Sequence, residues 1–277
     1  MADPGSTALA GVCATDSGLL KRDSGVLDRL LANGDVEWDA FDSDAYFAKN
    51  YGYLRDDDAQ IIEIVADFFH TAAPVRWRAK ALDVGTGANL YPAMTMLPFA
   101  GELSLVEPAD SNRNWLASEL ARPHGSWTQF WSRVSAQRPE YERIKGPFDL
   151  LRHNAEIHKG SVFSLPANQF DLGTMFFVAE SITTRRDEFQ KASRSFVRSL
   201  LPRAPFAAAF MRNSVGYSVG GQDFPACAVT EEDVQKCLAE DADIKHIQIV
   251  ESRDLREGYS GMIVATGWKK VTSPTGR

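Results

Sequence analysis

The segment Asp83-Val84-Gly85-Thr86-Gly87-Ala88-Asn89 has the composition of a ligand-binding turn. It follows the apolar run AKALDV, which predicts a buried strand, and residues 88–97 after it predict a helix. Glycines at positions 85 and 87 allow a tight turn and let a ligand touch the main chain. Glu107 ends the next predicted strand, where a carboxylate can accept hydrogen bonds from both hydroxyls of a ribose. Together these features predict a ligand that contains a nucleoside.

Two classes of ligand compete for this turn. A dinucleotide prefers GxGxxG, whose third glycine permits close helix packing, and here Leu90 occupies that place. Asp83 would repel a pyrophosphate, but it suits a cationic nucleoside without phosphates, such as S-adenosylmethionine. A nicotinamide-dependent oxidoreductase on a similar sheet is an alternative against which Leu90 argues. A further interpretation is that Gly85 and Gly87 only turn the chain.

Strand and helix patterns alternate from Lys80 onward, which predicts a parallel sheet with helices on both faces. The last two predicted strands are joined by a loop too short for a crossover helix, so they should be antiparallel. We therefore expect a Rossmann-like, doubly wound α/β fold with seven strands and an antiparallel last pair. The expected strands lie at 79–85, 102–107, 155–162, 170–180, 204–211, 246–252 and 262–270, and the expected helices at 88–97, 111–120, 188–200 and 230–238.

The N-terminal part of the chain differs from this core in composition. Residues 1–20 are rich in small and polar residues and predict a flexible tail. Residues 21–75 carry helical signals near Ser24, a dense group of aromatic residues from Trp38 to Tyr53 and an amphipathic helix after Asp56. We expect residues 21–75 to form a helical cap and residues 76–270 to form the core domain, with Trp38 and Phe47 in the hydrophobic core.

Composition excludes several classes of function. The chain has 277 residues, 44% hydrophobic and 24% charged, which supports a large core. A net charge of −7 makes general nucleic-acid binding improbable, because such binding depends on basic surfaces. No apolar run is long enough to cross a bilayer and the first residues lack a signal peptide, so no membrane association and a cytoplasmic location are expected. The three cysteines and five histidines match no metal-binding spacing.

Segments on both sides of the glycine turn point to a family. The sequence resembles a class I S-adenosylmethionine-dependent methyltransferase and, more narrowly, the family of nicotinamide, phenylethanolamine and thioether methyltransferases, from about Asp44 to Lys269. The segments that carry the resemblance are DAYFAKNYGYL, DVGTGANLY, EPADSN, SVGYSVGGQDF and the long insertion that contains Trp127 and Trp131.

The resemblance implies a set of residues that bind S-adenosylmethionine. Tyr46 and Tyr51 belong to an aromatic motif that closes over cofactor and substrate. The other implied contacts are Asp83, Gly85 and Gly87 beside the methionine part, Tyr91 at its carboxylate, Glu107 on the ribose, Asn112 near the adenosine, and Ser161-Val162 at the adenine. Relatives place an Asp-Val pair at the adenine amine, so here a serine hydroxyl replaces a carboxylate.

Four residues are candidates for the methyl acceptor. Tyr217 lies in the segment that the family brings to the acceptor pocket. Glu180 follows the fourth predicted strand, and Arg212 and Asn213 follow the fifth, at the edge where such sheets place substrate-facing residues. Relatives that methylate amines carry an acid where this chain has the stretch around Arg212, which argues against a nicotinamide or catecholamine acceptor.

The resemblance implies methyl transfer by an in-line SN2 displacement. We expect a small, planar, aromatic, nitrogen-containing acceptor, such as an indole or aryl amine of natural-product type, methylated on nitrogen or on a ring carbon, with S-adenosylhomocysteine as the other product. The alternative is a module that binds S-adenosylmethionine and regulates a partner without catalysis. The sequence does not indicate the oligomeric state.

Overall fold

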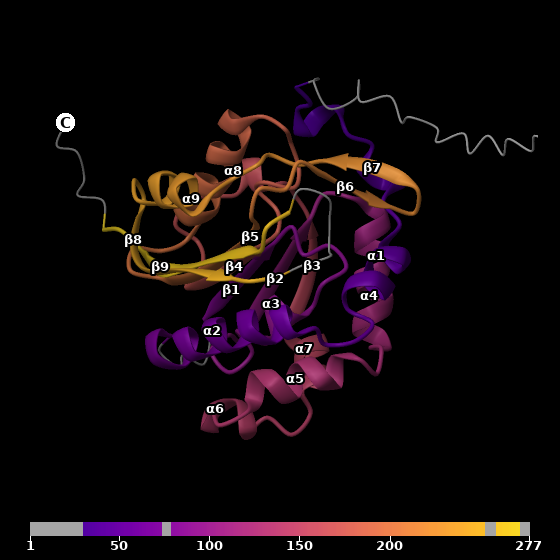
Figure 1. Ribbon diagram of the computed structural model, residues 1–277. Helices are drawn as coiled ribbons and strands as arrows, with labels where there is room; N and C mark the ends of the chain where they lie inside the picture. Colours follow the sequence, from indigo (N-terminus) through magenta and orange to yellow (C-terminus); the bar gives the residue numbers. More distant parts are fainter. Residues whose placement is uncertain (1–29, 74–78, 253–258, 272–277) are drawn as a thin grey trace, which may run out of the picture.

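Seven strands form one sheet in the computed structural model, which describes residues 30–73, 79–252 and 259–271. Their order is β3-β2-β1-β4-β5-β9-β8, and every neighbouring pair is parallel except β5 with β9 and β9 with β8 (Figure 1). The predicted Rossmann-like sheet with an antiparallel last pair is therefore confirmed. The strands are Lys80–Val84 (β1), Glu102–Glu107 (β2), Ala155–Lys159 (β3), Leu172–Phe176 (β4), Pro205–Met211 (β5), Ala242–Val250 (β8) and Met262–Lys269 (β9).

Side chains of the sheet alternate between two hydrophobic layers, because successive residues of a strand point to opposite faces. On β5, Phe206 and Phe210 belong to one layer and Ala207 and Ala209 to the other. The first layer packs against α8 (Arg186–Ser199) and α9 (Glu231–Leu238), and the second against helices on the opposite face (Figure 1). The helices of the second layer include α2 (Asp56–Ala72), α3 (Tyr91–Met94), α4 (Asp110–Ala121) and α5 (Trp127–Ser135).

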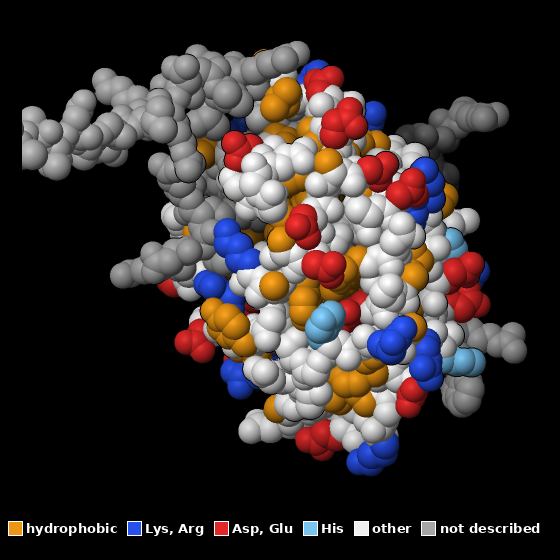
Figure 2. All heavy atoms as spheres, turned by 90° about the vertical axis from the view of Figure 1, so that its right-hand side faces the viewer, with side chains coloured by type: hydrophobic (Ala, Val, Ile, Leu, Met, Phe, Trp, Pro, Cys, Tyr) orange, Lys and Arg blue, Asp and Glu red, His pale blue; other side chains and the backbone are white. Residues whose placement is uncertain are grey.

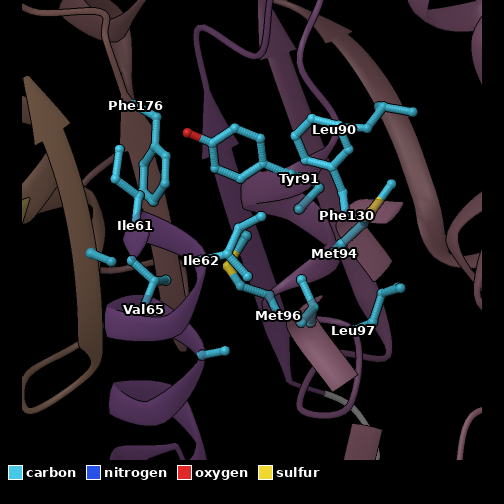
Figure 3. Close-up of a cluster of buried hydrophobic side chains, with 14 of the residues drawn as sticks. Ile61, Ile62, Val65, Leu90, Tyr91, Met94, Met96, Leu97, Phe130 and Phe176 are labelled. Atoms are coloured by element: carbon cyan, nitrogen blue, oxygen red, sulfur yellow. The ribbon is translucent and has the colours of Figure 1, made fainter. Parts of the chain in front are cut away.

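Helix α2 forms as the apolar periodicity predicts, and it packs directly on the sheet. Ile61, Ile62 and Val65 of α2 meet Tyr91 of α3 and Phe176 of β4 in the second layer (Figure 3). The predicted cap, residues 21–75, includes helix α2. The buried face of α2 nevertheless belongs to the core beneath the sheet. The predicted tail, residues 1–20, and the helical signals near Ser24 fall outside the described residues, and the division into tail, cap and core stays a prediction.

The helix predicted over residues 88–97 is wrong in extent. The structure has only the single turn α3, Tyr91–Met94, with Pro92 in its first turn and a series of turns from Thr95 to Phe99. Pro98 lacks a backbone N–H and restricts Leu97 before it, so the helix cannot continue. The insertion after α4 holds α5, the short α6 (Pro139–Glu142) and α7 (Pro147–Asn154) before the chain enters β3.

A two-stranded hairpin outside the main sheet was not predicted as a strand pair. It consists of β6 (Gly216–Val219) and β7 (Gln222–Pro225), joined by Gly220 and Gly221, which both have positive φ. Glycine adopts that backbone conformation readily, which a two-residue hairpin turn requires. Phe224 of the hairpin packs with Phe41 and Trp38 in a third apolar cluster, so the hairpin and the segment before α1 (Ser43–Asn50) fold against each other.

The face that carries α1 and α4 is shown in Figure 2. Lysine and arginine side chains on it are interspersed with acidic ones, and apolar patches lie between them. Across the described residues, no helix combines the length and apolar character that crossing a membrane requires.

Candidate active site

A cavity opens at the carboxyl ends of β1, β2 and β4. It encloses about 780 Å³ when the space open to solvent is included. The sheet order reverses between β1 and β4, and open α/β sheets bind ligands at this position. The lining residues are Asn33, Trp38, Phe41, Tyr46, Tyr51, Gly85, Thr86, Gly87, Ala88, Asn89, Glu107, Pro108, Asn112, Ser161, Val162, Phe176, Phe177, Val178, Ser181, Ile182 and Tyr217.

Glu107 lines the cavity from the end of β2 and is only 4% exposed. Its Oε1 accepts hydrogen bonds from the Ala109 N–H (3.0 Å) and the Asn112 side-chain amide (3.2 Å), and its Oε2 accepts one from the Gly87 N–H (3.0 Å). A carboxylate oxygen has about two lone pairs, so Oε2 keeps an acceptor position for a ligand. Burial raises the pKa of Glu107 above its usual value, although these donors act in the opposite direction.

The glycine loop is pressed against the segment that follows β4. Gly85 has a φ of +67°, and a Cβ at this position would lie 2.5 Å from a methyl carbon of Val178. Its N–H donates to the carbonyl of Val106 at 2.7 Å, which joins the loop to β2. Gly87 also has positive φ, +55°, but a Cβ there would meet no atom closer than 3.7 Å. Close packing therefore requires glycine at position 85, and the backbone conformation favours it at both.

Asp83 lies beneath the glycine loop and does not line the cavity. Its Oδ1 accepts a hydrogen bond from Thr174 Oγ1 at 2.7 Å, and its buried Oδ2 forms no hydrogen bond in the described part of the chain. Burial raises the Asp83 pKa to about 7. Asp83 thus sits next to the predicted methionine site, one layer behind the residues that face it.

Tyr91 also lies behind the cavity wall. Its ring is buried in the layer beneath the sheet and is stacked on Phe130 at 5.7 Å (Figure 3). Burial and the nearby Asp58 carboxylate raise the Tyr91 pKa well above its usual value. The ring contacts Tyr51 edge-on at 5.9 Å. The structure therefore places Tyr91 in support of Tyr51, and a contact between Tyr91 and the cofactor carboxylate stays a prediction.

Asp58 should make the stability of the protein fall as the pH rises. The side chain is 3% exposed, and burial with the neighbouring Asp57 charge raises its pKa to about 8. Between its unfolded pKa near 4 and pH 8 the carboxyl is ionised only when the chain unfolds, so rising pH favours unfolding. Between pH 5 and pH 7 the free energy of unfolding should drop in the wild type. In the variant Asp58→Asn we expect this drop to be smaller by about 2 kcal/mol.

Urea denaturation at both pH values measures this difference. The exposed neighbour Asp56 is the matched control, and Asp56→Asn should leave the pH dependence as it is. Equal slopes for Asp58→Asn and the wild type would contradict the assignment.

Aromatic side chains from the N-terminal segment form one wall of the cavity. Tyr46 contacts Phe41 at 5.1 Å and Tyr51 at 6.0 Å between ring centroids. Trp38 stacks on Phe224 of the hairpin at 5.6 Å, and its indole N–H donates to the side-chain oxygen of Asn33 at 3.0 Å. Trp38 was expected in the core and instead lines the cavity, because the hairpin supplies the surface on which it packs.

The predicted adenosine contacts lie together at the far end of the same cavity. Ser161 and Val162 follow β3 and line it, and Ser161 Oγ accepts a hydrogen bond from the Phe163 N–H at 3.3 Å. Asn112 of α4 also lines it and accepts a hydrogen bond from Ser43 Oγ at 2.7 Å. Asn112 therefore links Glu107 to the first turn of α1, and Glu107 in turn is hydrogen-bonded to the glycine loop.

The four acceptor candidates separate in the structure. Tyr217 of β6 lines the cavity, and its hydroxyl donates to the carbonyl of Ser181 at 3.3 Å. Glu180 is fully buried behind the wall. Arg212 is paired with Glu231 of α9 at 2.9 Å, and Asn213 donates to Ser260 Oγ at 2.9 Å, both outside the cavity. The ion pair and the turn after β5 direct these two side chains away, so the structure gives no support for direct acceptor contacts by Arg212 or Asn213.

A family model described as the NNMT/PNMT/TEMT family matches residues 30–266, which is most of the chain. The chain belongs to this family. The predicted recognition as a class I methyltransferase is therefore confirmed. No curated protein matches the sequence significantly.

Several solved structures share the fold of this family member at low sequence identity. A SAM-dependent methyltransferase from Methanosarcina mazei has 13% identity and a TM-score of 0.54, with 74% of this chain and 98% of that chain covered. The DhpI–SAH complex has 13% identity and a TM-score of 0.51, with 82% and 91% covered. These similarities show that the two proteins have the same fold as this methyltransferase.

Several cavity residues of this methyltransferase were not found by sequence reasoning. Phe177, Ser181 and Ile182 come from the segment directly after β4, and Phe41 comes from the N-terminal segment. Phe177 has a φ of +60°, an uncommon conformation for a bulky residue, and its N–H donates to Ala209 of β5 at 2.7 Å. Their position after a parallel strand was a usable signal, but the sequence does not show which side chains of such a loop turn inward.

Proposed function

We propose that this methyltransferase transfers a methyl group from S-adenosylmethionine to a small, planar, uncharged aromatic acceptor that contains nitrogen. The observation that carries the proposal is the composition of the cavity. It joins the glycine loop and Glu107 to a cage of aromatic side chains, and Glu107 is the only charged side chain among the described residues that line it.

The polar end of the cavity fits a nucleoside that carries a positive charge and no phosphate. Neither lysine nor arginine is among the described lining residues, so no side chain is present to pair with a pyrophosphate. Glu107 Oε2 would accept hydrogen bonds from the ribose hydroxyls, and Ser161 and Val162, the proposed adenine contacts, line the same cavity. The fold neighbour DhpI, whose structure is a complex with SAH, supports the same cofactor class.

The aromatic end suits a cation and a flat acceptor. The bound cofactor would supply an activated methyl group on a positively charged sulfur. Tyr46, Tyr51 and Phe177 all line the cavity, and the Tyr46 and Tyr51 rings lie 6.0 Å apart in an edge-on arrangement. A cation near an aromatic face gains about 0.5–2 kcal/mol, depending on its exposure. The same side chains exclude water and hold a planar ring, and orientation of this kind can supply about 7–11 kcal/mol of a barrier.

The absence of a base among the described lining residues restricts the nucleophile. The described lining residues include neither histidine nor lysine, and their one carboxylate, Glu107, accepts a hydrogen bond from the glycine loop. An acceptor must therefore react with a lone pair or an electron-rich ring carbon that is available without proton removal. Pyridine-type nitrogens, aryl amines and the C3 carbon of indoles meet this condition, and the hydroxyl oxygen of a phenol does not. The described residues include no cluster of three or more His, Cys, Asp or Glu side chains suited to a metal ion.

Two measurements test the proposal against the alternative of a regulatory module. Calorimetry with S-adenosylmethionine should give saturable binding, and its absence at millimolar ligand would refute the cofactor assignment. Incubation with methyl-labelled S-adenosylmethionine and a panel of pyridines, aryl amines, indoles and phenols should then label nitrogen-containing members and release S-adenosylhomocysteine. Tight cofactor binding with no transfer to any panel member or to a cell extract would favour the regulatory module.

A further inference from the structure

Ser181 is a polar side chain in the otherwise apolar acceptor end of the cavity. It lies five residues after the end of β4, is 3% exposed and lines the cavity together with Phe177, Ile182 and Tyr217. Its backbone is fixed on both sides. Its N–H donates to the carbonyl of Val178 at 2.9 Å, and its carbonyl accepts the Tyr217 hydroxyl at 3.3 Å. The position of the Ser181 hydroxyl is therefore well defined.

The hydrogen of the Ser181 hydroxyl is committed to the protein. Ser181 Oγ lies 3.0 Å from Glu180 Oε1. Glu180 Oε1 also accepts a hydrogen bond from the Met211 N–H at 2.9 Å. A backbone N–H can only donate, so Oε1 is an acceptor even when the other carboxyl oxygen carries a proton. Ser181 is therefore the donor when Glu180 is ionised and also when the Glu180 proton is on Oε2. Glu180 itself is held in place, because its carbonyl accepts the Cys227 N–H at 2.7 Å.

We propose that Ser181 selects methyl acceptors that carry an N–H donor, and that Glu180 is the positioning residue that makes Ser181 Oγ an acceptor only. The inference rests on the proposed function and narrows its acceptor class. A serine hydroxyl that rotates freely serves donors and acceptors alike. Here its hydrogen points to Glu180, and the remaining lone pairs of Oγ can pair only with a donor on the bound ring.

An acceptor without an N–H at this place would leave the lone pairs of the buried Ser181 Oγ without a donor. Sites built around a hydrogen bond reject analogues that lack the matching group more strongly than apolar pockets reject a change in size. The neighbouring Tyr217 strengthens the preference, because its hydroxyl hydrogen is donated to the Ser181 carbonyl. The selected substrates are planar heteroaromatic compounds or aryl amines with an N–H next to the methylated atom or as the methylated nitrogen itself.

The test compares ligand pairs that differ in one N–H. Indole against benzofuran and aniline against toluene are titrated into the full-length protein saturated with S-adenosylhomocysteine, and the dissociation constants are measured by calorimetry or competition. We expect the N–H member of at least one pair to bind the wild type about tenfold more tightly than its partner. In Ser181→Ala this ratio should fall to about twofold or less. In Ser181→Thr, which keeps the hydroxyl, it should recover.

Further variants separate a specific role from a structural one. Ser164→Ala removes an exposed hydroxyl outside the cavity and should keep the wild-type ratio. Glu180→Leu should lower the ratio although Ser181 is intact, which a role in packing alone would not do. If that variant fails to fold, the Ser181 series still decides. A wild-type ratio near one in both pairs, no binding of either N–H ligand, or an unchanged ratio in Ser181→Ala would overturn the inference. Cofactor binding and methyl transfer in the same preparations would show that the proposed function stands independently.

Discussion

The variant Glu107→Ala is expected to weaken S-adenosylmethionine binding by about 3 kcal/mol, or roughly 150-fold in Kd. In the proposed complex the carboxylate accepts hydrogen bonds from the ribose hydroxyls, and it also accepts them from the Gly87 N–H and the Asn112 amide. Its removal therefore takes away direct hydrogen bonds to the ligand and leaves donors of the site unpaired. Isothermal titration calorimetry of both proteins measures the effect.

Two controls define what the loss means. Glu107→Gln keeps one carbonyl oxygen as an acceptor and should lie between alanine and the wild type. Glu102→Ala changes the exposed carboxylate at the other end of β2, 64% exposed, and should leave the affinity unchanged. An unaltered dissociation constant in Glu107→Ala would mean that the ligand does not use this carboxylate.

The variant Gly85→Ala is expected to lower the free energy of unfolding by about 3 kcal/mol, from a backbone penalty of about 1–2 kcal/mol and an overpacking cost of similar size. Its Cβ would lie 2.5 Å from Val178, within a φ of +67° that alanine tolerates poorly. The loop must move away from the segment after β4, so cofactor affinity should fall as well. Urea denaturation and calorimetry measure the two effects.

Gly87→Ala is the matched control for stability. It carries the same backbone penalty, with φ at +55°, but its Cβ meets no atom closer than 3.7 Å. We expect a loss of only about 1 kcal/mol. Equal losses in the two variants would show that contact with Val178 contributes nothing and that the backbone conformation explains both.

The cofactor end of the cavity was largely predictable from the sequence. Gly85, Gly87 and Glu107 mark consecutive strand ends, and parallel strands bring their carboxyl ends to one edge, so local patterns are enough to place them together. Ser161 and Val162 were predicted from the family resemblance. Asp83 and Tyr91 show the limit of prediction from sequence position. A position along the chain does not reveal whether a side chain faces the cavity or the hydrophobic layer behind the cavity wall.

The sequence alone determined the fold class and the cofactor-side strand ends, because strand and helix periodicity and glycine turns are local properties. The antiparallel last pair also followed, since a short loop cannot contain a crossover. Only the tertiary structure decided the acceptor side. The pairing of Arg212 with Glu231, the stacking of Trp38 on Phe224 and the contact between Ser181 and Glu180 depend on how the hairpin, the N-terminal segment and the loop after β4 pack together. Those contacts join residues far apart in the chain, and no local pattern specifies which side chain turns inward.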